Sequence, residues 1–274
     1  MTATLLTTKR VEKPWGRHHL WPGFADPASD GAPVGEVWFE APGDAAPDLL
    51  IKYLFTSEKL SVQVHPDDEA ARAAGYPRGK DEAWVILAAE PDSTIALGTL
   101  APVEVNALRA AALDGSIVEL LDWKPVKAGD YFYSPAGTVH AIGAGITLVE
   151  VQQNVDLTYR LYDYGRPREL HLDAGVAVSQ AEPFVAQAAP GEVAPERSIL
   201  AEGPKFVLER WAAGEHHVSL PVDVPGWLVP LAGHGVADDV PWQAGQCLML
   251  RDQARIDVAA GGDVLFAYPG SNRI

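Results

Sequence analysis

The chain has 274 residues, and its 47% hydrophobic content is enough to bury a substantial core, which excludes a disordered or fibrous protein. Its 25 glycines and 22 prolines disrupt helix interiors, so they exclude a helical bundle and favour short strands joined by turns. The formal net charge of −16 repels phosphate polymers and anionic lipids, which excludes nucleic acid and membrane surfaces as partners. It still permits a small phosphorylated ligand, if Lys and Arg gather in a cleft.

The sequence also indicates a compartment. No apolar run follows a basic segment at the start, and no stretch approaches the roughly 20 apolar residues of a membrane span. Cys247 is the single cysteine, so an internal disulfide is excluded and a cytoplasmic location is expected. We expect Cys247 to be a small buried apolar side chain.

Segments rich in β-branched or aromatic residues and bounded by Gly, Pro or Asp recur along the chain, and each predicts a strand. These segments are residues 34–39, 49–56, 83–87, 131–134, 146–152, 205–212 and 227–231. Acidic residues in a first turn predict a helix over residues 67–74. A second helical region is expected at about 103–121, interrupted at Asp114-Gly115, as an insertion between two strands.

The composition changes near residue 186. Residues 186–196 are rich in Ala, Pro, Gly and Glu without periodicity, which predicts a connector. We therefore expect a catalytic domain over residues 1–185, and the connector with a smaller β-domain over residues 186–274. Residues 245–250 repeat the Gly-polar-apolar opening of residues 129–134 and predict a second, degenerate barrel. It has no His at the corresponding place, so we assign it no metal.

Four polar residues in the first half form a candidate metal site. Side chains alternate along a strand, so Gln63 and His65 point the same way. Glu82 and His140, arriving from neighbouring strands, would complete a set of two imidazoles, one carboxylate and one amide. This set suits a catalytic zinc with an open position, and the lack of Cys argues against a closed structural site. Manganese or iron also accepts such ligands.

The segment from Gly129 to His140 fits the second cupin motif, G-x5-P-x-G-x2-H. The motif combines a strand, a Pro-x-Gly turn and a return strand that aims His140 into a barrel. The match therefore predicts a β-barrel around the four polar residues.

Several motifs together resemble a known family. The chain is similar to the short type I phosphomannose isomerases of the cupin superfamily, in a region of roughly residues 9–175. The resemblance implies a mainly β fold, with cupin jelly-roll barrels, a small helical insertion and a degenerate second cupin-like half. It is carried, in the order of the family, by residues 13–16 (KPWG), 35–38 (GEVW), 60–67 (LSVQVHPD), 79–84 (GKDEAW) and 153–164 (QNVDLTYRLYDY).

The resemblance implies the ligands and the cofactor. By it, one Zn²⁺ per chain is bound by Gln63, His65, Glu82 and His140.

The resemblance also implies four catalytic residues. Arg160 matches the active-site arginine, Asp156 an acid shortly before it, Lys80 a lysine proposed for proton transfer and Lys52 a second lysine facing the metal. Asp81 departs from the Thr or Pro of many members, and we expect it to add negative charge near the ligand set.

The implied activity is a zinc-dependent isomerase that interconverts mannose 6-phosphate and fructose 6-phosphate through an enediol, with a sugar phosphate as its small-molecule partner. One alternative is a cupin metalloprotein of other chemistry, such as a dioxygenase, although iron typically takes a His-rich set and Gln63 replaces one histidine here. A second alternative is a non-catalytic sugar-phosphate-binding cupin. The sequence predicts no oligomeric state.

Overall fold

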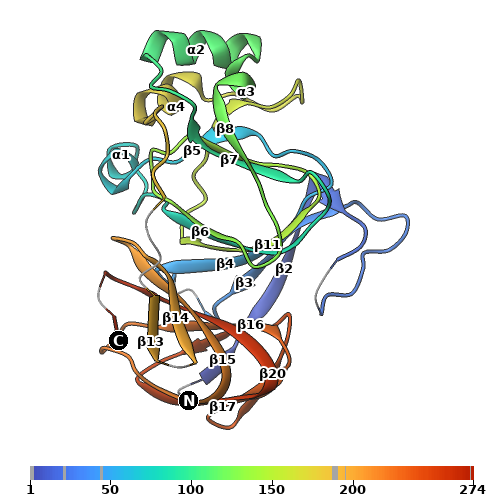
Figure 1. The fold of residues 1–274 in the computed structure, drawn as a ribbon, viewed down its shortest axis with the longest axis vertical. Helices are drawn as coiled ribbons and strands as arrows, with labels where there is room; N and C mark the ends of the chain where they lie inside the picture. The colour runs from blue at the N-terminus through green and yellow to red at the C-terminus, as the bar shows by residue number, and fades with distance from the viewer. Residues whose placement is uncertain (1–2, 21–22, 44–45, 187–190, 195, 272) are drawn as a thin grey trace. The chain divides into compact units, whose positions relative to one another are not determined.

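A computed structural model describes residues 3–20, 23–43, 46–186, 191–194, 196–271 and 273–274 (Figure 1). It divides the chain into two compact units. We call residues 14–17 and 54–186 the central unit, and residues 1–13, 18–53 and 187–274 the terminal unit.

Antiparallel strands in two groups build the central unit. One sheet has the order β12-β5-β10-β7-β8, and β11, β6 and β9 lie next to one another in a second sheet. Figure 1 shows the two groups facing each other around a common interior. The bounds are β5 (Val62–Val64), β6 (Glu82–Ala89), β7 (Thr94–Thr99), β8 (Leu121–Pro125), β9 (Tyr131–Ser134), β10 (His140–Ile142), β11 (Ile146–Gln153) and β12 (Tyr159–Tyr162).

The predicted first helix is confirmed as α1 (Asp68–Ala73). Asp67 caps it, because its side chain accepts a hydrogen bond from the Ala70 N–H at 2.8 Å. Asp68 and Glu69 place negative charge in the first turn, where the helix dipole favours it.

The predicted helical insertion is also confirmed, between β7 and β8. It consists of α2 (Val105–Asp114) and α3 (Ile117–Leu120), and Gly115 ends α2 with a left-handed φ of 87°. A further helix, α4 (Leu172–Val178), was not predicted. Apolar side chains of these three helices share one core cluster with Val62 and Val64 of β5, so the helices cover the outer face of that sheet (Figure 1).

This packing fixes what faces the interior. Since Val62 and Val64 face the helices, Gln63 between them faces the inside of the barrel. A second apolar cluster contains Trp84 and Ile86 of β6 and Ile142 of β10. Two residues before Trp84 and Ile142 stand Glu82 and His140. The apolar cluster therefore fills one end of the interior, and polar side chains occupy the other.

The terminal unit is also mainly β, and its largest sheet has the order β1-β19-β16-β20-β15-β14-β13, with β17 pairing with β18 and β20. Cys247 is buried and free, as predicted. The strands are β1 (Ala3–Leu5), most of β2 (Thr7–Arg17), β3 (Val34–Glu40), most of β4 (Leu49–Phe55), β13 (Gly191–Ala194), β14 (Arg197–Glu202), β15 (Phe206–Ser219), β16 (Gly226–Ala232), β17 (His234–Ala237), β18 (Val240–Gln243), β19 (Leu248–Leu250) and β20 (Gln253–Pro269).

The two units differ from the division expected at residues 185 and 186. The central unit does end at Ala186, but most of residues 1–53 belong with residues 187–274. The physical reason is pairing over a long sequence distance, since Ala3 lies opposite Leu250 in β1 and β19. Within the predicted connector, residues 187–190 and 195 lie outside the described residues, and Gly191–Ala194 form a strand paired with β14.

Every strand predicted from its composition is present, and the bounds agree within two residues except for β15, which was expected to end at residue 212 and continues to Ser219. The short strands β5 and β10 were expected from the metal-site and cupin motifs, because their composition offers too little sequence for a strand pattern, and β12 was not predicted. Among the described residues, no helix combines the length and the apolar character needed to cross a membrane.

Candidate metal centre

Three of the four predicted ligands converge inside the central unit. His65, Glu82 and His140 are 2%, 1% and 1% exposed, and each offers a ligand atom within 4.8 Å of the others. Nε2 of His65 lies 3.2 Å from Oε1 of Glu82, and Nε2 of His140 lies 3.6 Å from Oε2. Among the described residues, these three form the one group of His, Cys, Asp or Glu side chains whose ligand atoms lie close enough together to hold a metal ion.

Short-range structure brings these residues together. Glu82 begins β6, His140 begins β10 and His65 directly follows β5. The Pro135-x-Gly137 turn precedes His140, and Gly137 has a φ of 88° that suits glycine. Its N–H donates to the His65 carbonyl oxygen at 2.8 Å, so the turn docks against the strand end that carries the other imidazole.

Both rings are held by their Nδ1 atoms. Nδ1 of His65 lies 2.9 Å from the Leu157 carbonyl oxygen, and Nδ1 of His140 lies 2.9 Å from the Thr138 carbonyl oxygen. A carbonyl oxygen only accepts hydrogen bonds, so each Nδ1 carries the proton. Each Nε2 then presents a lone pair to the centre, as in metal-binding histidines.

The charge states also suit a cation. Burial lowers the pKa of His65 to about 3, and the Lys80 ammonium acts in the same direction. Burial likewise lowers the pKa of His140. Burial would raise the pKa of Glu82, but Lys80, His65 and His140 together outweigh it and hold that pKa well below 4.5. At neutral pH the centre therefore contains two neutral imidazoles and a carboxylate, the forms that bind metals.

Unsatisfied polar atoms remain in this centre. Nε2 of His65 and both carboxylate oxygens of Glu82 are buried and accept no hydrogen bond, although Lys80 Nζ lies 2.8 Å from Oε1 as an ion pair. Buried polar atoms rarely lack partners. A divalent cation would satisfy all three, and an N,N,O set without Cys suits zinc, manganese or iron.

Gln63 lies beside the three residues, directly opposite His140 across β5 and β10. Its Nε2 is 3.2 Å from Nε2 of His140, and its Oε1 accepts from the Ser61 hydroxyl at 3.3 Å. Half a turn of the amide would direct Oε1 at the centre. The structure therefore brings together all four residues that the sequence suggested as ligands.

Two of the predicted catalytic residues belong to the same surroundings. Lys80 is 6% exposed and contacts Glu82 through the ion pair given above. Arg160 of β12 lies directly opposite Gln63 of β5, which places both side chains on one face of the sheet. Its Nη1 donates to the Glu169 carbonyl oxygen at 2.7 Å, and its buried Nε has no partner among the described residues.

The other two predicted catalytic residues lie differently. Asp156 is exposed, and no ion pair joins it to Arg160 among the described residues. Lys52 belongs to the terminal unit, where its Nζ is 3.8 Å from Oε2 of Glu36. That Lys52 faces the metal stays a prediction.

Sequence reasoning did not foresee the contacts of Asp81. Its carboxylate accepts hydrogen bonds from the Tyr133 hydroxyl at 2.5 Å and from the Ala136 N–H at 3.0 Å. The sequence predicts only that this residue adds negative charge near the ligand set, whereas its carboxylate binds Tyr133 and the turn after β9. No sequence pattern indicates these contacts, because Asp81 precedes β6 and its two partners lie 52 and 55 residues further along the chain.

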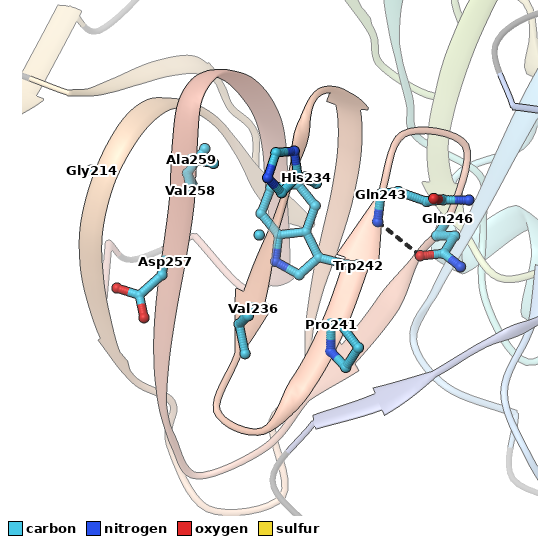
Figure 2. A pocket seen from close by; sticks show the side chains of 11 residues that line it. Gly214, His234, Val236, Pro241, Trp242, Gln243, Gln246, Asp257, Val258 and Ala259 are labelled. Carbon is cyan, nitrogen blue, oxygen red and sulfur yellow. Dashed lines mark hydrogen bonds between the residues drawn. The ribbon is translucent and has the colours of Figure 1, made fainter.

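A cavity of about 700 Å³ lies elsewhere, in the terminal unit (Figure 2). Trp242, His234 and Asp257 line it, and the Gln243 N–H donates to Oε1 of Gln246 at 2.9 Å. None of the predicted catalytic or metal-binding residues lines this cavity, so it is separate from the candidate metal centre.

Comparison with known proteins shows which proteins this chain resembles. No family model matches the chain. The chain is 38% identical over 198 residues to mannose-6-phosphate isomerase of Streptococcus mutans, covering 68% of this chain and 61% of that protein. It is 46% identical over 143 residues to mannose-6-phosphate isomerase ManA of Bacillus subtilis, covering 50% of this chain and 45% of that protein.

The chain is a relative of the mannose-6-phosphate isomerases. The match spans between 45% and 61% of the length of the curated relatives. A crystal structure of mannose 6-phosphate isomerase from Bacillus subtilis superposes with a TM-score of 0.81 at 26% identity, covering 97% of this chain and 99% of that one.

A structure described as mannose 6-phosphate isomerase in a zinc-bound holo form is 15% identical, with a TM-score of 0.71 over 98% of this chain and all of that one. At this identity it shows the shared fold alone. The resemblance recognised in the sequence and the predicted mainly β, cupin-type fold are both confirmed.

Proposed function

We propose that this chain is a metal-dependent isomerase that interconverts mannose 6-phosphate and fructose 6-phosphate. The observation that carries the proposal is the buried group of His65, Glu82 and His140, in charge states ready for metal, within a chain similar to mannose-6-phosphate isomerases. Zinc is the proposed cation, held by these three residues and Gln63, with one ion per chain.

The reaction requires a proton to move between C1 and C2 of the sugar. A bound cation would polarise the substrate oxygens and stabilise negative charge on them. Glu82 is committed to the cation, so it is unsuited to be the base. Lys80 is the neighbouring group that can transfer a proton, because its Nζ lies 2.8 Å from a Glu82 oxygen and its side chain is nearly buried.

Arg160 is proposed to bind an oxyanion of the substrate. Its position opposite Gln63 supports this role, because the two side chains lie on one face of the sheet, and a guanidinium can donate two parallel hydrogen bonds to oxygens. Asp156 and Lys52 are proposed as further substrate-facing residues on the family resemblance alone. A cytoplasmic location also remains a prediction.

An assay of activity and metal content tests the proposal. Purified protein is given mannose 6-phosphate, and fructose 6-phosphate is measured by a coupled reaction before and after chelator treatment. We expect turnover that the chelator abolishes and added Zn²⁺ restores, with about one zinc per chain by elemental analysis. Absence of turnover at full metal occupancy would contradict the proposal. Binding of mannose 6-phosphate without turnover would favour the non-catalytic sugar-phosphate-binding alternative. Consumption of oxygen would favour the dioxygenase alternative.

A further inference from the structure

The carboxylate of Asp81 links two strands of the barrel. It is 3% exposed and lies between Lys80 and Glu82 in the chain. Its Oδ2 accepts from the hydroxyl of Tyr133 in β9, and its Oδ1 accepts from the N–H of Ala136 in the turn that follows β9. One side chain thus ties the start of β6 to the end of β9 and to the next turn.

The main chain of Asp81 is fixed on its other side. Its N–H donates to Oε1 of Gln153 at 3.0 Å, and the Gln153 N–H donates to the Asp81 carbonyl oxygen at 3.1 Å. Gln153 ends β11, which pairs with β6. Because its backbone is anchored to one neighbouring strand, Asp81 gives its carboxylate a fixed position from which to hold the turn.

That turn controls His140. The Thr138 N–H donates to the Pro135 carbonyl oxygen at 3.1 Å, and the Thr138 carbonyl oxygen accepts from Nδ1 of His140 at 2.9 Å. A displacement of Ala136 therefore reaches the imidazole through two residues of backbone.

We propose that Asp81 is a positioning residue that sets the separation between Glu82 and His140, so that tight cation binding requires its carboxylate. This inference rests on the metal centre of the proposed function. Asp81 itself acts through the turn and lies outside the ligand set. Residues beyond the ligands typically change metal affinity by about 10–100-fold when they are mutated.

Three variants separate the contributions. Asp81→Ala removes both hydrogen bonds, and we expect its Zn²⁺ dissociation constant to rise by about 10–100-fold. Asp81→Asn keeps an oxygen that can accept from the Ala136 N–H but loses the negative charge. Tyr133→Phe removes only the hydrogen bond from the Tyr133 hydroxyl. We expect each of these two variants to raise the Zn²⁺ dissociation constant by about 3–10-fold. The matched control is Asp130→Asn. In the wild type, the Asp130 carboxylate accepts a hydrogen bond from the Lys127 N–H at 2.9 Å, in the turn before β9.

Two measurements on the full chain test the inference. Competition with a chromophoric chelator gives the Zn²⁺ dissociation constant. The visible absorption spectrum of the Co²⁺-loaded protein reports ligand geometry, which a purely structural role would leave unchanged. Thermal unfolding of the metal-free variants shows which of them fold. If Asp81→Ala does not fold, the inference is tested on Asp81→Asn and Tyr133→Phe.

The outcomes distinguish two failures. Wild-type protein that binds neither Zn²⁺ nor Co²⁺ would overturn the metal centre and the inference together. Wild-type binding with unchanged affinity and Co²⁺ spectrum in the folded Asp81 variants would overturn the inference alone. An effect of equal size in Asp130→Asn would also overturn it, since any loosening of β9 would then suffice. Weakened binding and an altered spectrum confined to Asp81 and Tyr133 variants would support it.

Discussion

Lys80 contacts one of the proposed metal ligands without being a ligand itself. Its positive charge stabilises the ionised carboxylate of Glu82. The contact of 2.8 Å with Glu82 acts together with His65 and His140 to keep that carboxylate ionised. A cation bound by Glu82 would take over this role and release the lysine for proton transfer. Lys80 thus connects metal binding with the chemistry proposed here.

Replacing this lysine tests its assignment. We expect Lys80→Met to lower kcat by about 10²–10⁴-fold, the usual contribution of a general acid or base, while the zinc content stays that of wild type. The control is Lys127→Met, because Lys127 is 85% exposed in the same unit. Near-normal turnover in Lys80→Met would remove the lysine from the proton-transfer role.

Glu36 is a second buried carboxylate with lysine partners, in the terminal unit. It is 8% exposed, with Nζ of Lys13 at 3.1 Å and Nζ of Lys52 at 3.8 Å. Burial would raise the pKa of Glu36, but the two lysines and a hydrogen bond from Trp38 outweigh it and lower that pKa below 4.5.

This pKa predicts how stability depends on pH. A carboxyl whose pKa is lower in the folded than in the unfolded state stabilises the protein above pH 4.5, and this contribution is lost as the pH falls through the folded-state pKa. In urea titrations of metal-free protein, we expect Glu36→Gln to be less stable than wild type at pH 7 by about 1–3 kcal/mol. We expect this difference to shrink below pH 4.5.

The control for this titration is Glu40→Gln. Glu40 lies in the same strand but is exposed, with Nζ of Lys9 at 3.8 Å, and an exposed ion pair contributes little. A constant gap between wild type and Glu36→Gln from pH 7 to pH 3 would contradict the assignment.

Among the elements, the helical insertion packs closely against β12, the strand that carries Arg160. A Cβ on Gly115 would lie 2.8 Å from the hydroxyl oxygen of Tyr162, at the end of β12. Gly75, which follows α1, has the same φ of 87° but has nothing within 4 Å of such a Cβ. The two glycines therefore share one backbone conformation and differ in their surroundings.

This pair separates backbone strain from packing. Gly75→Ala is expected to lower the free energy of unfolding by about 1–2 kcal/mol, the cost of the left-handed conformation. Gly115→Ala should cost about 1–3 kcal/mol more, because the new methyl group collides with Tyr162. Urea denaturation of both variants measures the difference, and equal losses would show that Tyr162 moves aside freely.

The elements also show how far local patterns reach. Acidic first-turn residues and Asp67 identified α1, and Asp114-Gly115 marked the break between α2 and α3. The strands of three or four residues, β5, β10 and β12, carry Gln63, His140 and Arg160, yet they are too short for periodicity to detect. Motifs located these residues where strand patterns could not.

At the scale of the whole molecule, the terminal unit joins both ends of the chain. The Leu6 N–H donates to the Cys247 carbonyl oxygen at 2.9 Å, and the buried Tyr53 hydroxyl donates to the Pro230 carbonyl oxygen at 3.3 Å. Residues before position 54 therefore depend on residues after position 186 for pairing and burial.

A fragment tests this dependence. Residues 1–185 contain every proposed ligand and catalytic residue, but they lack β19, the partner of β1. We expect this fragment to aggregate or to unfold with little cooperativity, because it leaves a strand edge and apolar residues uncovered. Size-exclusion chromatography and circular dichroism measure this, with co-expression of residues 186–274 as the rescue. A monodisperse fragment that unfolds as cooperatively as the full chain would contradict the division described here.

The amino-acid sequence was sufficient to predict the mainly β class, the helices at 67–74 and 103–121, and the residues proposed as ligands. These follow from short motifs and side-chain alternation, which act over a few neighbouring residues. The three-dimensional fold was needed to show that most of residues 1–53 belong to the terminal unit, that Asp156 is exposed and that Asp81 contacts the turn before His140. Each of these depends on contacts between segments distant in the chain, and no local pattern encodes which distant segments meet.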